Sequence, residues 1–120
     1  MSQTALTTLT KARALISNEG NWTQRAFAKD GKGRIVPFRD KLATRFCAEG
    51  ACHRASKGFP TAALQILERA AQSMAGKSSK LPTVWAINDD MGHEAVLEMF
   101  DRAIKMAKRR RSKNARANRR

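Results

Sequence analysis

Apolar residues recur at steps of three and four along four segments of the chain, and this period predicts four helices that each bury one face. The first helix is expected over residues 4–17, with Thr4 as its cap and Asn18-Glu19-Gly20 after its end. Its buried face is expected to consist of Leu6, Leu9, Ala12 and Ile16.

The second helix is expected to run from Asp40, a favourable N-cap residue, to about Ser56. Gly50 and Ala51 lie in the middle of its inward face, where small residues let another element approach closely. A glycine at such a position costs the helix about 1 kcal/mol relative to alanine. The inward positions are Ala43, Phe46, Cys47, Gly50, Ala51 and Arg54.

Two further helices are expected in the second half of the chain. Pro60 opens the third, which runs to about Ala75 and ends at Gly76, before a polar loop over residues 76–81. The run Asn88-Asp89-Asp90 offers several caps for the last helix. The apolar faces comprise Ala63, Ile66, Leu67, Ala70 and Met74 in the third helix, and Val96, Met99, Phe100, Ala103, Ile104 and Ala107 in the last.

Between the first two helices, Arg25–Lys29 and Arg34–Val36 are expected to form short strands joined by a turn over Asp30–Gly33. A lone pair of strands is marginally stable, so this hairpin has to lie against helices. The apolar stretch Thr83–Ile87 is expected to be extended or to fill the core as a loop. The expected fold is mainly α, with about four helices around one core and a short β-hairpin between helices 1 and 2.

Charge divides the chain unevenly. The 120 residues contain 24 Lys and Arg against 10 Asp and Glu, a formal net charge of +14, and 42% of them are hydrophobic, which excludes general disorder. Residues 105–120 carry nine of the bases and no acid, so residues 1–104 hold the other 15 bases and all 10 acids. We expect a compact helical domain over 1–104 and a basic C-terminal arm over 105–120, either a helix extension or disordered.

Such an unneutralised arm predicts a polyanionic partner, and nucleic acid is the commonest one. Cations that meet phosphates release condensed counterions, which favours binding without reading the sequence. The expected function is that of a small non-enzymatic nucleic-acid-binding protein, whose partner is DNA, RNA or a nucleoprotein assembly. The expected phosphate-binding residues are Lys105, Lys108, Arg109, Arg110, Arg111, Lys113, Arg116, Arg119 and Arg120 in the arm, and Arg25, Lys29, Lys32 and Arg34 in the hairpin.

Two other functions are compatible with the sequence but are less well supported. The arm could dock on an acidic surface of a nucleic-acid-processing complex, in which case the protein is an interaction module. Alternatively, Cys47 and His93 are a possible nucleophile and base, with Asn88 or Asp89 orienting the histidine, although three common residues without diagnostic spacing support this weakly. Trp22 and Trp85 could stack on unpaired bases, but we expect both to lie in the core.

No metal, cofactor or membrane partner is expected. Four metal ligands are reached only by using every Cys and His in the chain, and Cys47 and Cys52 face about 140° apart on a helix. Buried Cys47 and partly exposed Cys52 and His53 are the simpler expectation.

The Asn88-Asp89-Asp90 run is interpreted as a cap, with an acidic site or a tether for Arg45 or Arg54 as alternatives. The sequence shows no signal peptide and no apolar span, so reduced thiols in the cytoplasm are expected.

Several short motifs are spread over residues 4–107. They are Trp22-Thr23-Gln24, Ala26-Phe27-Ala28, Gly33, Cys47-Ala48-Glu49-Gly50-Ala51, Asn88-Asp89, Val96-Leu97 and Phe100-Asp101-Arg102-Ala103-Ile104. Together they resemble a small bacterial and phage domain family of unknown function. The family usually has Trp where this chain has Phe46, and a longer turn where it has Asp90-Met91-Gly92-His93. The resemblance implies a bacterial or phage cytoplasmic protein, assigns no activity, and leaves the basic arm outside.

Overall fold

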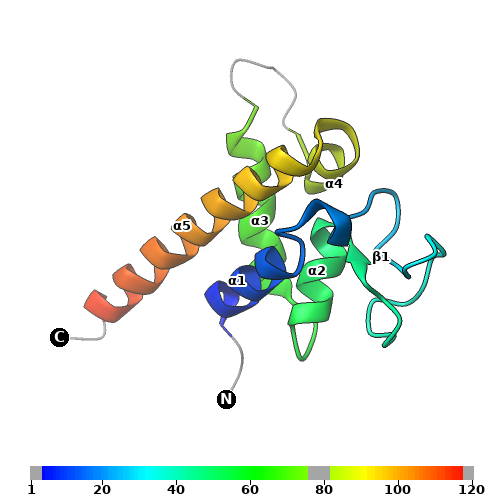
Figure 1. Ribbon diagram of the computed structural model, residues 1–120. Coiled ribbons are helices and arrows are strands. Elements are labelled where there is room, and N and C mark those ends of the chain that lie inside the picture. Colours follow the sequence, from blue (N-terminus) through cyan, green and yellow to red (C-terminus); the bar gives the residue numbers. More distant parts are fainter. Residues whose placement is uncertain (1–3, 76–81, 118–120) are drawn as a thin grey trace.

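The computed structural model describes residues 4–75 and 82–117, with side chains as far as residue 113 in the last helix (Figure 1). The described part is mainly α, as expected, but it has five α-helices rather than four. A two-stranded antiparallel sheet lies between the first two helices in the sequence. The expected helix end at Gly76 and the polar loop over 76–81 lie outside the described residues.

The helices and strands follow one another along the chain with two short irregular helical turns between them. The α-helices are α1 (Ala5–Leu15), α2 (Ala48–Ala55), α3 (Thr61–Ser73), α4 (Val84–Ala86) and α5 (His93–Ala117). The strands are β1 (Ala28–Lys29) and β2 (Arg45–Phe46). A 3₁₀ turn spans Glu19–Asn21, and a π-helical turn spans Ile87–Met91 directly after α4.

Helices α1, α3 and α5 pack on one another around the core, with α2 against α1 (Figure 1). Most of the apolar positions that recur in the sequence are buried in the structure, so the pattern predicted these faces well. Thr4 caps α1 as expected, since its hydroxyl oxygen accepts the N–H of Thr7 at 3.1 Å. The buried side chains include Leu9, Ala12 and Ile16 from α1 and its C-cap, Ala63, Ile66, Leu67 and Ala70 from α3, and Val96, Met99, Phe100, Ala103 and Ala107 from α5.

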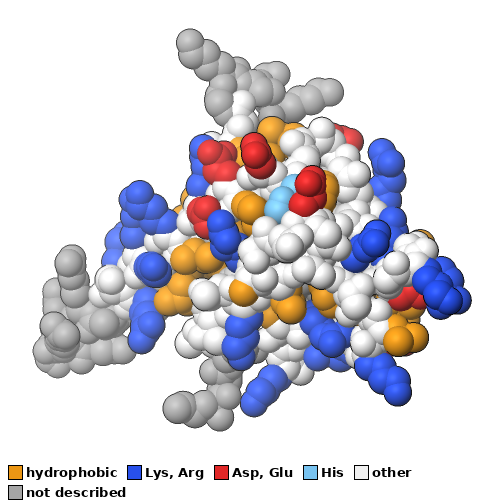
Figure 2. Space-filling model, in the orientation of Figure 1, with side chains coloured by type: hydrophobic (Ala, Val, Ile, Leu, Met, Phe, Trp, Pro, Cys, Tyr) orange, Lys and Arg blue, Asp and Glu red, His pale blue; other side chains and the backbone are white. Residues whose placement is uncertain are grey.

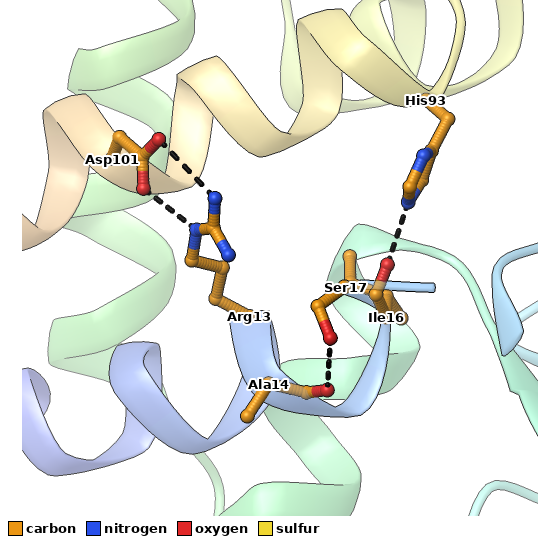
Figure 3. Close-up of polar contacts among 6 residues, drawn as sticks. All are labelled: Arg13, Ala14, Ile16, Ser17, His93 and Asp101. Carbon is orange, nitrogen blue, oxygen red and sulfur yellow. Dashed lines mark hydrogen bonds and ion pairs between the residues drawn. The ribbon is translucent and has the colours of Figure 1, made fainter. Parts of the chain in front are cut away.

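Two polar contacts tie α1 to α5 at the edge of this core (Figure 3). Arg13 donates from Nε to the carboxylate of Asp101 at 2.6 Å, in an exposed ion pair. His93, the first residue of α5, lies with Nε2 2.6 Å from the carbonyl oxygen of Ile16, so that nitrogen carries the proton and donates. These contacts join the C-terminal end of α1 to the first turns of α5.

The expected helix from Asp40 to Ser56 is wrong in its first half. Residues 40–47 form turns and β2, and α2 begins only at Ala48, after Cys47 as its N-cap. The backbone before α2 is used in pairing: Cys47 donates its N–H to the carbonyl of Phe27 at 3.2 Å, and Thr44 donates to that of Lys29 at 3.0 Å. A helical backbone would bond within itself instead, so pairing with β1 excludes a helix here.

The hairpin is partly as expected. The turn over Asp30–Gly33 forms, with Gly33 at a φ of 82° that favours glycine. Residues 34–36, however, make only a single bridge, Lys29 to Ile35, and the second strand is β2. Ala28 pairs with Phe46 and Lys29 with Arg45 in antiparallel register.

Residues 84–91 are helical, whereas the sequence predicted Thr83–Ile87 to be extended or a loop that fills the core. Thr83 caps α4 by accepting the N–H of Ala86 at 3.0 Å, and Val84 and Ile87 point into the core. Trp85, expected in the core, is instead 67% exposed between them. The run Asn88–Asp90 does not cap α5, which begins after Gly92.

Candidate nucleic-acid interface

The C-terminal part of α5 presents the densest positive charge among the described residues. Ala107 is the last buried residue of α5, and every residue from Lys108 to Lys113 is exposed. At 1.5 Å per residue, the helix continues for about 15 Å beyond Ala107, and it projects past the helical body (Figure 1). Figure 2 shows acidic side chains over the first half of α5 and basic ones towards its C-terminal end.

A groove of about 840 Å³ lies between this part of α5 and α3. Gln65, Ile66, Met106 and Ser112 form its other walls, and none of its described lining residues is acidic. The six cations that line it are Arg69, Lys105, Lys108, Arg109, Arg110 and Lys113. A concave surface with one sign of charge concentrates the field and attracts a polyanion.

The helix itself holds these cations close together. Arg109 and Lys113 are four residues apart, and Lys108 and Arg111 three apart, so each pair shares a face and repels. The basic residues also lie at the C-terminal end, where the helix dipole favours positive charge. An anion bound here would relieve the repulsion while leaving the favourable dipole interaction in place.

The groove contains five of the nine arm residues that the sequence predicted to bind phosphate, and Arg69 of α3 lines it as well. Arg111 lines a smaller depression of about 440 Å³ beside α1, which Arg110 also lines. Arg116 lies on α5 without a described side chain, and Arg119 and Arg120 lie outside the described residues. Sequence reasoning missed Arg69, three residues after buried Ile66 on α3; its only signal was a position beside the apolar face.

The expected hairpin cations are not part of this groove. The loop that carries Lys29, Lys32 and Arg34 lies on the opposite side of the molecule from the end of α5 (Figure 1). Arg34 also pairs with Asp30, its Nε 2.9 Å from a carboxylate oxygen. The pKa of Asp30 is lowered chiefly by the hydrogen bond from the backbone N–H of Arg34. The predicted phosphate-binding residues of this loop and those of the arm therefore lie apart in the structure.

A second concave site lies at the junction of α2, α4 and the segment before β1. It has a volume of about 440 Å³, and Phe27, Cys47, Glu49, Trp85 and Asp89 are among its walls. Arg25, Ala26, Val84 and Asn88 complete the described lining. Several of the short sequence motifs thus meet around one pocket.

Asn88 holds the segments around this pocket together. Its Oδ1 accepts the indole N–H of Trp22 at 2.8 Å and the backbone N–H of Ala48, the first residue of α2, at 2.9 Å. Its Nδ2 donates to the carbonyl of Thr23 and to Asp89 Oδ1, both at 3.1 Å. Asn88 therefore joins its own helical turn to two distant segments, one with Trp22 and Thr23 and the other at the start of α2. Neither the capping of α5 nor a tether for Arg45 or Arg54 describes its role.

Cys47 and His93 contact different groups and do not line the same pocket. The Cys47 sulfur accepts the N–H of Gly50 at 3.2 Å, and burial raises the pKa of this thiol to about 11. The His93 ring lies 5.4 Å from that of Trp22 and does not line the pocket that contains Cys47. A nucleophilic cysteine needs a lowered pKa, so this geometry does not favour the nucleophile and base hypothesis.

The raised pKa predicts slow thiol chemistry. Moving the thiol pKa from 9.0 to about 11 lowers the thiolate fraction at pH 8 about 100-fold. We expect both cysteines of the folded protein to react with a disulfide reagent at least about tenfold more slowly than in urea, and the rate to rise with pH towards pH 11. Equal rates in the folded and unfolded chains, followed by absorbance, would contradict this expectation.

The remaining candidate metal ligands are more buried than expected. Cys52 is fully buried, and His53 is only 9% exposed, stacked on Phe38 and edge-on to Phe59. Burial, assisted by the charge of Arg39, lowers the pKa of His53. Within residues 4–75 and 82–117, no three His, Cys, Asp or Glu side chains gather closely enough to hold a metal ion. In the same ranges no helix has the length and apolarity required to cross a bilayer.

Comparison with known proteins identifies the family of the chain. The model of a family of unknown function, DUF6197, matches residues 1–106, so the chain belongs to this family. No curated protein and no solved structure matches the chain. The matched range includes the pocket at α2 and α4, whereas the cations from Lys108 onwards follow it in the sequence.

Proposed function

We propose that this family member is a small, non-enzymatic nucleic-acid-binding protein, in which the C-terminal part of α5 binds the phosphate backbone. The observation that carries the proposal is the groove between α3 and α5, lined by six cations and, among its described residues, by no acid. The helical body serves to hold α5 in place through its buried face.

The proposed binding does not depend on the nucleotide sequence, because it involves the phosphates. Lys and Arg side chains that project from a rigid helix can reach successive phosphates, and binding then releases condensed counterions. A helix with its side chains is about 10–12 Å wide, which suits the major groove of B-DNA, about 12 Å wide. RNA offers the same phosphate charge, so both polymers belong in the test.

Two buried, unpaired thiols support a reducing cytoplasm, and we propose a bacterial or phage origin.

The test removes charge and keeps the helix. Substituting Lys108, Arg109, Arg110, Arg111 and Lys113 with Gln removes five positive charges, leaving +9 of the +14. None of the five is buried, so the thermal midpoint should change little. We expect affinity for a duplex DNA or a single-stranded RNA to fall about 100-fold at low salt, and the slope of log K against log salt to become shallower by about 4. Fluorescence anisotropy at two salt concentrations measures both.

The hairpin provides the matched control. Substituting Arg25, Lys29, Lys32 and Arg34 with Gln removes four charges from the other side of the molecule, and we expect a loss of affinity below about tenfold. Substitution is preferable to truncation after residue 104, because truncation removes buried Ala107. Equal affinities of the parent and the five-fold variant, or binding without salt dependence, would refute the proposal and favour an acidic protein surface as the partner.

A further inference from the structure

The pocket between α2 and α4 has no role in the proposed phosphate binding. Its volume of about 440 Å³ lies within the range of about 300–1,000 Å³ typical of small-ligand sites. Its described lining combines two aromatic side chains, Phe27 and Trp85, with two carboxylates, Glu49 and Asp89. This is a different chemistry from the all-basic groove beside α3.

The carboxylates are available to a ligand. Glu49 is half-buried, yet its carboxylate makes no hydrogen bond or ion pair with any residue that the structure describes. Burial, with a contribution from the charge of Glu68, raises the pKa of Glu49. In Asp89, Oδ1 accepts the backbone N–H of Arg25 at 3.0 Å and an amide hydrogen from Asn88, while Oδ2 accepts none from the described chain.

The aromatic walls are exposed but held in place. Trp85 is 67% exposed, although its neighbours Val84 and Ile87 are buried and fix the helical turn that carries it. Phe27 is 44% exposed and lies 5.7 Å, ring centre to ring centre, from buried His53. An aromatic surface exposed to solvent beside carboxylates is suited to a planar or compact cation.

Arg25 is the cation among the described lining residues, and it does not neutralise the pocket. Glu49 and Asp89 carry two negative charges, and Glu68 adds a third nearby. Arg25 is exposed and has a φ of 62°, a left-handed conformation that is unfavourable for a residue with a side chain. Asp89 holds it there through the backbone hydrogen bond, and such strain is often found at binding sites.

We propose that this pocket binds an arginine side chain, with the guanidinium group facing the carboxylates of Glu49 and Asp89 and its flat face against the aromatic walls. Arginine fits better than lysine because its planar group both stacks on aromatic rings and donates two parallel hydrogen bonds to a carboxylate. The arginine can come from a free derivative or from a basic peptide, including the C-terminal arm of a second copy, and the test separates these sources.

The primary test uses a neutral isostere. The full chain is titrated with N-acetyl-arginine amide and with N-acetyl-citrulline amide, which has nearly the same shape without the charge, and the indole resonance of Trp85 is followed by NMR. We expect the arginine derivative to bind at least about tenfold more tightly than citrulline. Glu49→Gln should weaken arginine binding about tenfold, whereas Glu19→Gln, an exposed change on the 3₁₀ turn, should leave it unchanged.

Equal binding of arginine and citrulline, or an unaltered affinity in Glu49→Gln, would overturn the proposal. A peptide of residues 105–120 separates the sources: much tighter binding than the single derivative indicates a basic peptide, and similar binding indicates a small molecule. The five-fold Gln variant of α5 retains the pocket, so it should bind the arginine derivative normally even where nucleic-acid binding is lost. The two proposals can therefore fail independently.

Discussion

Replacing Gly50 with alanine is expected to lower the free energy of unfolding by about 3 kcal/mol or more. A Cβ atom at this position would lie 1.9 Å from the carbonyl oxygen of Phe27 and 2.7 Å from its carbonyl carbon. Both are backbone atoms, which cannot move aside as the end of a flexible side chain can. Urea unfolding followed by circular dichroism measures the change.

Two opposing effects act at Gly50, and their magnitudes decide the sign. Within a helix, alanine is favoured over glycine by about 1 kcal/mol. Moving the Phe27 carbonyl, however, also breaks its hydrogen bond with the N–H of Cys47 and disturbs the pairing of β1 with β2. The clash therefore outweighs the gain in helix propensity.

Gly58 and Gly31 supply matched controls for this experiment. An added Cβ would meet nothing within 4 Å at either position, and neither has a positive φ. Gly58→Ala and Gly31→Ala should change stability by less than about 1 kcal/mol, with stabilisation the expected direction. A Gly50→Ala variant as stable as these controls would show that α2 does not approach Phe27 as closely as described.

Asn88→Ala is expected to lower the free energy of unfolding by about 3–5 kcal/mol, because it leaves several buried polar groups without partners at about 1–3 kcal/mol each. The indole N–H of Trp22, the backbone N–H of Ala48 and the carbonyl of Thr23 all lose a hydrogen bond. Asn88 is 3% exposed, so the groups that it bonds are largely shielded from water in the folded protein. Urea unfolding at neutral pH measures this loss.

Asn21→Ala is the appropriate comparison for Asn88→Ala. Asn21 is exposed and donates one hydrogen bond, to the carbonyl of Thr44 at 3.0 Å. We expect its loss to cost about 1 kcal/mol or less. Similar values for the two variants would mean that the Asn88 network contributes no more than an ordinary surface hydrogen bond.

The residues that the periodic pattern placed correctly share one property. Helices α1, α3 and α5 each have an apolar face that repeats along a continuous segment, as in Leu9, Ala12 and Ile16. Helix formation and burial of that face depend on neighbours three and four residues away, which the sequence displays directly. Local capping at Thr4 was predictable for the same reason.

The candidate sites were predictable only in part. The basic arm is evident from composition, but the sequence left open whether it extends the last helix or is disordered, and the structure describes α5 as far as Ala117. Arg69, however, joins the groove because α3 packs beside α5. The pocket with Glu49 and Trp85 likewise exists only because two segments more than thirty residues apart in the sequence meet there.

The sequence by itself determined the helical character of this protein, three of its principal helices and the concentration of positive charge near residue 105. Tertiary structure alone decided that residues 40–47 pair with β1, that Asn88 joins Trp22 to α2, and that the hairpin cations lie away from α5. The physical reason is that helix periodicity and charge are local properties of the chain. Strand pairing, buried hydrogen bonds and pocket walls instead require partners whose positions depend on how the whole core packs.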